Sequence, residues 1–164
     1  MGMPLLHHDW TVAERDALPD DGNRYEVIDG ELFVTPERIG YALLGPADVV
    51  FSAKRGVRPD VFVVPPRDGR RPDRFDREKG LLLAAEVLSP STARADRVRK
   101  RALYRDEGVP EYWIIDMDAR TFERSTPGDP RPEILAERLE WQPAGASAPL
   151  AIDIVEFFVD VLDR

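Results

Sequence analysis

The chain of 164 residues contains no cysteine. This absence excludes disulfide bonds, thiolate zinc sites and cysteine nucleophiles, and it agrees with a reducing compartment. The sequence also lacks an apolar run long enough to cross a bilayer, and residues 1–8 have neither the basic nor the apolar region of a secretion signal. We therefore expect a cytoplasmic protein. The length and the hydrophobic content of 43% are typical of one globular domain spanning residues 1–164.

Positive charge is scarce, because 31 acidic residues outnumber 23 basic ones and leave a formal net charge of -8. Nucleic-acid binding normally relies on Lys and Arg, so the composition argues against a nucleic-acid partner. The arginines are nevertheless clustered. One segment carries Arg94, Arg97, Arg99, Arg101 and Arg105, and another carries Arg67, Arg70, Arg71, Arg74 and Arg77. A basic rim can coexist with an acidic body, although solvated surface ion pairs explain these arginines equally well.

Local patterns predict a mixed α/β (α+β) chain that begins with a short helix and a hairpin. Thr11 can cap a helix over residues 10–18, and Asp29-Gly30 is a two-residue hairpin turn between strands at Tyr25–Ile28 and Glu31–Val34. Further strands are predicted at Val49–Ser52, Asp60–Val64, Leu81–Leu88, Tyr112–Asp116, Thr121–Arg124, Ile134–Leu135 and Leu139–Trp141. Helices are predicted from Ser91 or Thr92 to Asp106 and from Asp153 to Leu162, and a solvated loop from Arg67 to Lys79.

Two carboxylates stand at the ends of predicted buried strands. Asp60 opens one apolar run, and Glu86 lies near the end of another. A carboxylate inside such a run is costly unless it is paired or bound to a metal. Two such groups on adjacent strands can hold a hard divalent cation through oxygen ligands, and a nearby ammonium can stabilise negative charge on a phosphate. This pattern indicates a metal-dependent nuclease site.

The helix predicted after Glu86 separates into three faces at about 100° per residue. The faces are an apolar stripe of Ala95, Val98 and Ala102, a mixed face of Asp96, Lys100, Leu103 and Tyr104, and a basic side of Arg94, Arg97, Arg101 and Arg105. Asp96 and Lys100 at i and i+4 are compatible with an exposed ion pair worth about 0.3–0.5 kcal/mol. They are equally compatible with a face directed at Asp60 and Glu86.

Four segments together resemble the Uma-type family of restriction endonuclease-like proteins, within the PD-(D/E)XK nuclease superfamily. The segments are Arg24–Leu32, Arg58–Val61, Glu86–Thr92 followed by Asp96, Lys100 and Tyr104, and Gly108–Asp116. The resemblance implies a restriction-endonuclease-like mixed β-sheet flanked by helices, with an N-terminal β-hairpin. It also implies hydrolysis of DNA phosphodiester bonds with Mg²⁺, or alternatively Mn²⁺, as the cofactor.

The resemblance implies specific roles for the residues that match the family's motifs. Asp60 and Glu86 would be catalytic metal ligands, and Val87 would add its backbone carbonyl. The superfamily's lysine normally follows the second acid by two positions, where this chain has Leu88, and Lys100 matches the position to which the family's lysine has moved. Candidates for orienting roles are Glu26 and Asp96, and candidates for nucleic-acid binding are Arg94, Arg97, Arg101 and Arg105.

The sequence departs from the family pattern between the hairpin and the strand at Val49. A helix-sized segment of the family is missing near Pro36 and Glu37, either as a deletion or because residues were left out of the sequence. DNA is the expected partner, and a homodimer is plausible because cleavage of two strands needs two sites. Two other functions stay open, which are a catalytically weak nucleic-acid-binding relative and an acidic protein-interaction module.

Overall fold

The computed structural model describes residues 9–18, 24–35, 39–66, 71, 75–76 and 80–163. The chain divides into two compact units, Met1–Arg38 and Ile39–Arg164, and each is described by itself. The missing segment predicted near Pro36 and Glu37 falls outside the described residues, as do Arg67, Arg70, Arg74 and Arg77. One domain over residues 1–164 therefore stays a prediction. No helix among the described residues is both long enough and apolar enough to span a membrane.

The first unit consists of a helix and a hairpin, as the sequence predicts. Helix α1 spans Val12–Asp16, and Thr11 and Glu14 form a reciprocal capping box at its start. Strands β1 (Arg24–Ile28) and β2 (Glu31–Thr35) pair antiparallel. The turn between them has φ values of 52° at Asp29 and 82° at Gly30, which match the twist of the two strands.

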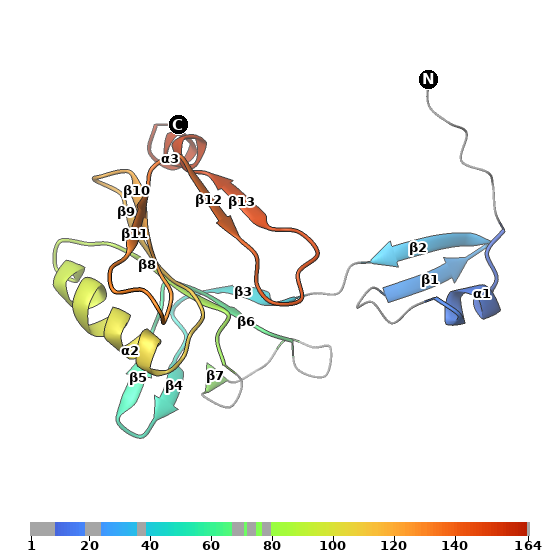
Figure 1. The fold of residues 1–164 in the computed structure, drawn as a ribbon, viewed down its shortest axis with the longest axis horizontal. Helices are drawn as coiled ribbons and strands as arrows, with labels where there is room; N and C mark the ends of the chain where they lie inside the picture. The colour runs from blue at the N-terminus through green and yellow to red at the C-terminus, as the bar shows by residue number, and fades with distance from the viewer. Residues whose placement is uncertain are drawn as a thin grey trace. The chain divides into compact units, whose positions relative to one another are not determined.

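The second unit contains a six-stranded mixed sheet in the order β11-β10-β9-β8-β6-β3 (Figure 1). Its strands are β3 (Tyr41–Leu44), β6 (Val61–Val64), β8 (Leu83–Val87), β9 (Tyr112–Asp116), β10 (Thr121–Ser125) and β11 (Glu133–Leu135). Only β8 and β9 pair in parallel, and the other neighbours are antiparallel. The predicted mixed sheet with flanking helices is confirmed.

Smaller sheets complete the second unit. Strands β4 (Val49–Ser52), β5 (Arg55–Val57) and β7 (Phe75–Asp76) form one, and β12 (Arg138–Trp141) pairs with β13 (Leu150–Asp153). The prediction of a loop over residues 67–79 is wrong at β7, because Phe75 and Asp76 pair in parallel with β4. The Phe75 ring packs edge-on against Phe62 at 5.0 Å, so an apolar contact orders this point of the segment.

Both longer helices follow the predicted positions, but one differs in geometry. A π-helix, η1 (Ala95–Lys100), continues directly into α2 (Arg101–Asp106), and the segment ends before Gly108 at a φ of 70°. Helix α3 spans Ile154–Leu162, and the Asp153 carboxylate caps it by accepting the Glu156 N–H at 2.9 Å.

The two faces of the six-stranded sheet bury separate apolar clusters. On one face, Phe62, Ala84 and Ile114 pack with Tyr104 of α2. On the other, residues of β8 to β10 pack with β12 and α3, including Leu83, Trp113, Phe122, Leu139, Trp141 and Phe158. Alternate residues of one strand therefore face different clusters. Glu86 shares the strand parity of Ala84, and its carboxylate accepts a hydrogen bond from the Tyr104 hydroxyl of α2 at 3.3 Å.

Of the faces that the sequence distinguishes on this helix, the apolar stripe is not the one that packs on the sheet. Val98 is 61% exposed, whereas Asp96 and Tyr104 are almost completely buried. The usual helical rotation already puts Val98 on a different side from Asp96, and the structure shows which of the two sides faces the sheet. The mixed face of Asp96, Lys100 and Tyr104 is the one turned inward.

A buried ion pair next to the core generates a stability prediction. Glu111 is 6% exposed and accepts hydrogen bonds from Trp113 Nε1 at 2.9 Å and from the Arg124 guanidinium at 2.9 and 2.5 Å. We expect Glu111→Ala to lower the free energy of unfolding by about 3 kcal/mol, because it leaves Arg124 without its main partner. Chemical denaturation measures this. Glu133→Ala is the matched control, since Glu133 is 59% exposed and 4.0 Å from Arg124. Equal losses in both variants would contradict the prediction.

Candidate active site

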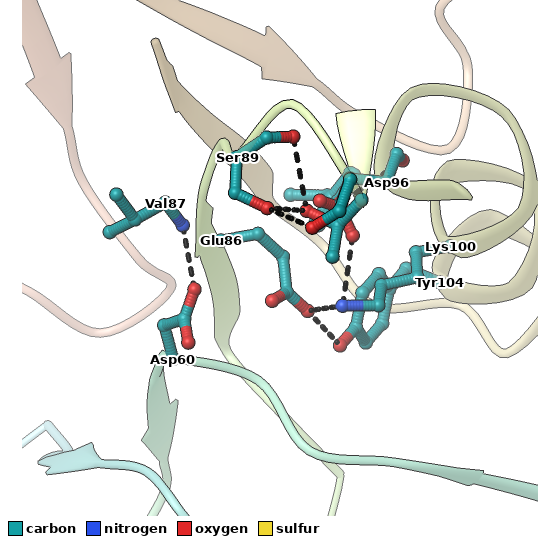
Figure 2. A network of polar contacts seen from close by, with 10 residues as sticks. Asp60, Glu86, Val87, Ser89, Asp96, Lys100 and Tyr104 are labelled. Carbon is teal, nitrogen blue, oxygen red and sulfur yellow. Dashed lines mark hydrogen bonds and ion pairs between the residues drawn. The ribbon is translucent and has the colours of Figure 1, made fainter. Parts of the chain in front are cut away.

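Antiparallel pairing brings the predicted acids Asp60 and Glu86 together. Val61 pairs with Ala85, so the start of β6 meets the end of β8 and places residue 60 beside residue 86. The Asp60 Oδ2 atom accepts the Val87 backbone N–H at 2.8 Å, as Figure 2 shows. The side chain of Asp60 therefore takes part in the end of the sheet. Among the described residues, no hydrogen bond reaches its Oδ1 atom.

Glu86 is a buried carboxylate with two donors on one oxygen. It is 3% exposed, and its Oε1 atom lies 3.0 Å from Lys100 Nζ and accepts the Tyr104 hydroxyl at 3.3 Å. Burial raises the pKa of Glu86, the Lys100 ammonium opposes this increase, and the charges of Asp60 and Asp96 add to it. In Figure 2 the second oxygen of Glu86 lies on the side of Asp60.

Lys100 joins two buried acids. Its ammonium lies 2.9 Å from Asp96 Oδ1 as well as 3.0 Å from Glu86 Oε1, and its side chain is 26% exposed. Burial lowers the pKa of Lys100, but the hydrogen bonds to Asp96 and Glu86 more than offset this, so the pKa rises above its usual value. Lys100 therefore stays charged. The pair at i and i+4 is not the exposed surface pair that the sequence also allowed.

Two tyrosines support this arrangement from the core. The Tyr104 and Tyr112 rings lie 4.7 Å apart, and the Tyr112 hydroxyl donates to the Asp96 carbonyl at 3.1 Å. Burial, followed by the Glu86 charge, raises the pKa of both hydroxyls, so both remain neutral donors. The sequence predicts the strand that carries Tyr112, but it does not reveal that either hydroxyl contacts the acidic residues.

The acids border an open cavity of about 540 Å³. Its lining includes Asp60, Glu86, Val87, Asp96 and Lys100, together with Leu44, Arg58, Val61, Ser89 and Thr92. Sequence reasoning missed Arg58, whose guanidinium donates to Asp48 at 2.6 Å. Ser89 and Thr92, whose hydroxyls lie 2.9 Å apart, form the turn that leads from β8 toward η1.

The arginines predicted to bind nucleic acid fall into different environments. Arg97 is engaged, since it donates to Glu123 at 2.7 Å and to Asp116 at 2.8 Å. Arg105 lies 3.6 Å from Asp106, Arg94 is exposed and Arg101 is half-buried. Glu26 is an exposed residue of β1 in the first unit. Its proposed orienting role stays a prediction.

The donor set at the cavity fits a divalent cation. Asp60 and Glu86 offer two hard carboxylates, and one of them is buried with a raised pKa, so a cation would relieve the electrostatic cost of its charge. Among the described residues, no group of three or more His, Cys, Asp or Glu side chains forms a metal cage. Mg²⁺ suits such a set, because it is commonly held by one or two carboxylates with water or phosphate oxygens as the other ligands.

Comparisons with known proteins show the family and the fold. The model of a family described as "Uma2: Putative restriction endonuclease" matches residues 33–152. Among solved structures, the chain is similar to a crystal structure described as "a putative nuclease belonging to DUF820" from Anabaena variabilis. That match has a TM-score of 0.61 and 21% sequence identity, and it covers 93% of this chain and 99% of the other. No curated protein matches the sequence. The family match confirms the resemblance, and the structural match shows the fold.

The buried acids generate a pH-dependent prediction. Without the ammonium, Lys100→Met should raise the pKa of Glu86 further. A carboxyl whose pKa is higher in the folded state holds its proton more tightly there, so stability falls as pH rises from the unfolded value toward the folded one. We therefore expect Lys100→Met to cost about 3 kcal/mol near neutral pH and less near pH 5.

Denaturation of the chelated protein at both pH values measures this loss. Lys54→Met, which removes an exposed ammonium in the β4–β5 turn, is the control and should change little at either pH. A loss in Lys100→Met that does not depend on pH would show that Glu86 is not the group responsible.

Proposed function

The chain belongs to the Uma2 family of restriction endonuclease-like proteins, and from this and its site we propose a Mg²⁺-dependent DNA endonuclease. Asp60, Glu86 and Lys100 would carry the reaction. The single observation that supports this most strongly is the Lys100 ammonium, 3.0 Å from a buried Glu86 at the edge of an open cavity.

The free-energy cost of burying the Glu86 carboxylate supports a functional role for this residue. An apolar side chain at this position would avoid the desolvation of a carboxylate, and replacement of buried ion pairs by apolar groups is often neutral or stabilising. Lys100 compensates that cost without removing it, since the pKa of Glu86 remains raised. Such uncompensated charge beside a cavity is typical of catalytic sites.

Each residue has a chemical task in the proposed reaction. Asp60 and Glu86 would hold the cation, which when bound polarises a phosphate and lowers the pKa of a coordinated water. Lys100 would stabilise the negative charge that develops on the phosphate, because its ammonium is fixed by two acids before the substrate arrives. Asp96 would hold the Lys100 ammonium in position, and Tyr104 would hold the Glu86 carboxylate. Cleavage of both strands of a duplex would need a second site, which a homodimer would supply.

Isosteric substitutions test the roles of these residues. We expect Asp60→Asn, Glu86→Gln and Lys100→Met each to slow DNA hydrolysis by about 100-fold or more, because the first two weaken the hold on the cation and the third removes the ammonium beside the reacting phosphate. Asn at residue 60 can still accept the Val87 N–H, so the end of the sheet should persist. The measurement is the rate of cleavage of plasmid and linear DNA with Mg²⁺ and with Mn²⁺.

Matched controls separate chemistry from charge. Glu133→Gln and Lys54→Met make the same changes of charge at exposed positions and should cleave at the wild-type rate. Unchanged cleavage in Asp60→Asn and Glu86→Gln would refute the assignment of the site. Purified wild-type protein that binds DNA but leaves it intact with both ions would point to a nucleic-acid-binding relative without activity.

Metal binding can be measured without any substrate. We expect Mg²⁺ at about 100 times its Kd to raise the free energy of unfolding by about 2.7 kcal/mol, because only the folded chain brings the two carboxylates together. Denaturation with and without Mg²⁺ checks this. Asp60→Asn should lose the stabilisation, and Glu133→Gln should keep it. A Mg²⁺ effect of equal size in Asp60→Asn would place the ion elsewhere.

A further inference from the structure

The outer side of η1 carries two arginines that its inner carboxylates do not neutralise. Arg94 and Arg99 are exposed, and among the described residues neither forms an ion pair with a carboxylate or donates a hydrogen bond to one. With Ser91, Ala95 and Val98 they line a shallow hollow of about 360 Å³. Arg97, one turn away in sequence but on another side, is held by Asp116 and Glu123.

This hollow lies next to the cavity that Asp60 and Glu86 line. Ser91 lines the hollow, and its hydroxyl lies 3.1 Å from that of Ser89. Ser89 lines the cavity, and so does Thr92, whose hydroxyl contacts the same Ser89 oxygen at 2.9 Å. The single turn from Ser89 to Thr92 therefore separates the hollow from the cavity. A polyanion with a phosphate at the carboxylates can reach the hollow by crossing this turn.

We propose that Ser91, Arg94, Val98 and Arg99 form the surface along which the DNA backbone lies next to the phosphate that is cleaved. The inference rests on the proposed nuclease function, and it names the contact surface of that site. The proposed surface differs from the set of arginines that the sequence predicts to bind nucleic acid. It adds Arg99, keeps Arg94 and omits Arg97, Arg101 and Arg105.

Charge complementarity favours DNA as the occupant. The chain as a whole carries -8, so a phosphate backbone is repelled by most of the molecule and attracted only where cations are exposed and unpaired. Two guanidinium groups offer forked donors that match phosphate oxygens. Val98, 61% exposed between them, presents an apolar side chain that can contact a deoxyribose without adding charge.

The salt dependence of binding tests the surface directly. Anisotropy of a fluorescent DNA duplex, measured in EDTA between about 50 and 200 mM salt, gives the slope of log K against log salt. Arg94→Gln/Arg99→Gln should reduce the magnitude of that slope by about 1.8, since each phosphate contact contributes about 0.9. Val98→Lys should increase it by about 0.9 and tighten binding. All three side chains are exposed, so the fold should tolerate both variants.

Arg131→Gln is the matched control. Arg131 is exposed in the loop between β10 and β11, at the end of the sheet where Ser125 pairs with Tyr112. Val87 pairs with Ile115 at the opposite end. The salt slope and the DNA affinity of Arg131→Gln should equal those of the wild type.

In cleavage assays with Mg²⁺, Arg94→Gln/Arg99→Gln should raise KM and leave kcat unchanged, because neither arginine contacts the reacting groups.

The outcomes separate this inference from the proposed function. A reduced slope in the double variant, with no cleavage by any protein, would support the surface and overturn the nuclease. Normal cleavage with an unchanged slope in both the double variant and Val98→Lys would overturn the surface and leave the nuclease standing. Absence of DNA binding by the wild type at every salt concentration, together with absence of cleavage with Mg²⁺ and Mn²⁺, would overturn both.

Discussion

The ion pair between Glu86 and Lys100 is the interaction on which the site depends. The register of β8 fixes the position of Glu86. Helix η1 directs Lys100 toward the sheet, so the Lys100 Nζ atom lies 3.0 Å from Glu86 Oε1. Asp96 holds the other side of Lys100, and Tyr104 donates to the same oxygen of Glu86. A carboxylate that is 3% exposed would be very costly alone, so strand, helix and tyrosine are bound to one another through it.

A second pairing repeats the same principle along the sheet. Arg97 reaches Asp116 at the end of β9 and Glu123 on β10, so the cations on the inner side of η1 are matched by carboxylates of the strands beneath. The cations on the outer side have no such partners among the described residues. The net charge of -8 therefore describes the body of the protein and not the surface beside the cavity. Composition alone gives a poor account of a protein whose charges are divided in this way.

Several features follow directly from the sequence, and others could not. The Asp29-Gly30 hairpin, the cap at Thr11 and the strands at Val49, Tyr112 and Thr121 depend on local chemistry, so local patterns predict them. Short strands such as β5 and β7 have too few residues to show a period, and pairing with β4 creates them. The acids and Lys100 are predicted as candidates, but their contacts depend on which face of the helix packs on the sheet. The sequence leaves more than one face possible, and tertiary packing buries Asp96 and exposes Val98.

The hydrogen bond between the Asp60 carboxylate and the Val87 N–H has a consequence for the strength of the sheet at its edge. Buried or partly buried backbone donors need an acceptor, and at this point a side chain replaces the carbonyl of a neighbouring strand. Asp60 thus extends the hydrogen bonding between β6 and β8 by one contact and also lines the cavity. A substitution at this position therefore affects both the edge of the sheet and the lining of the cavity. A residue that cannot accept a hydrogen bond would fray the strand ends where they border the cavity.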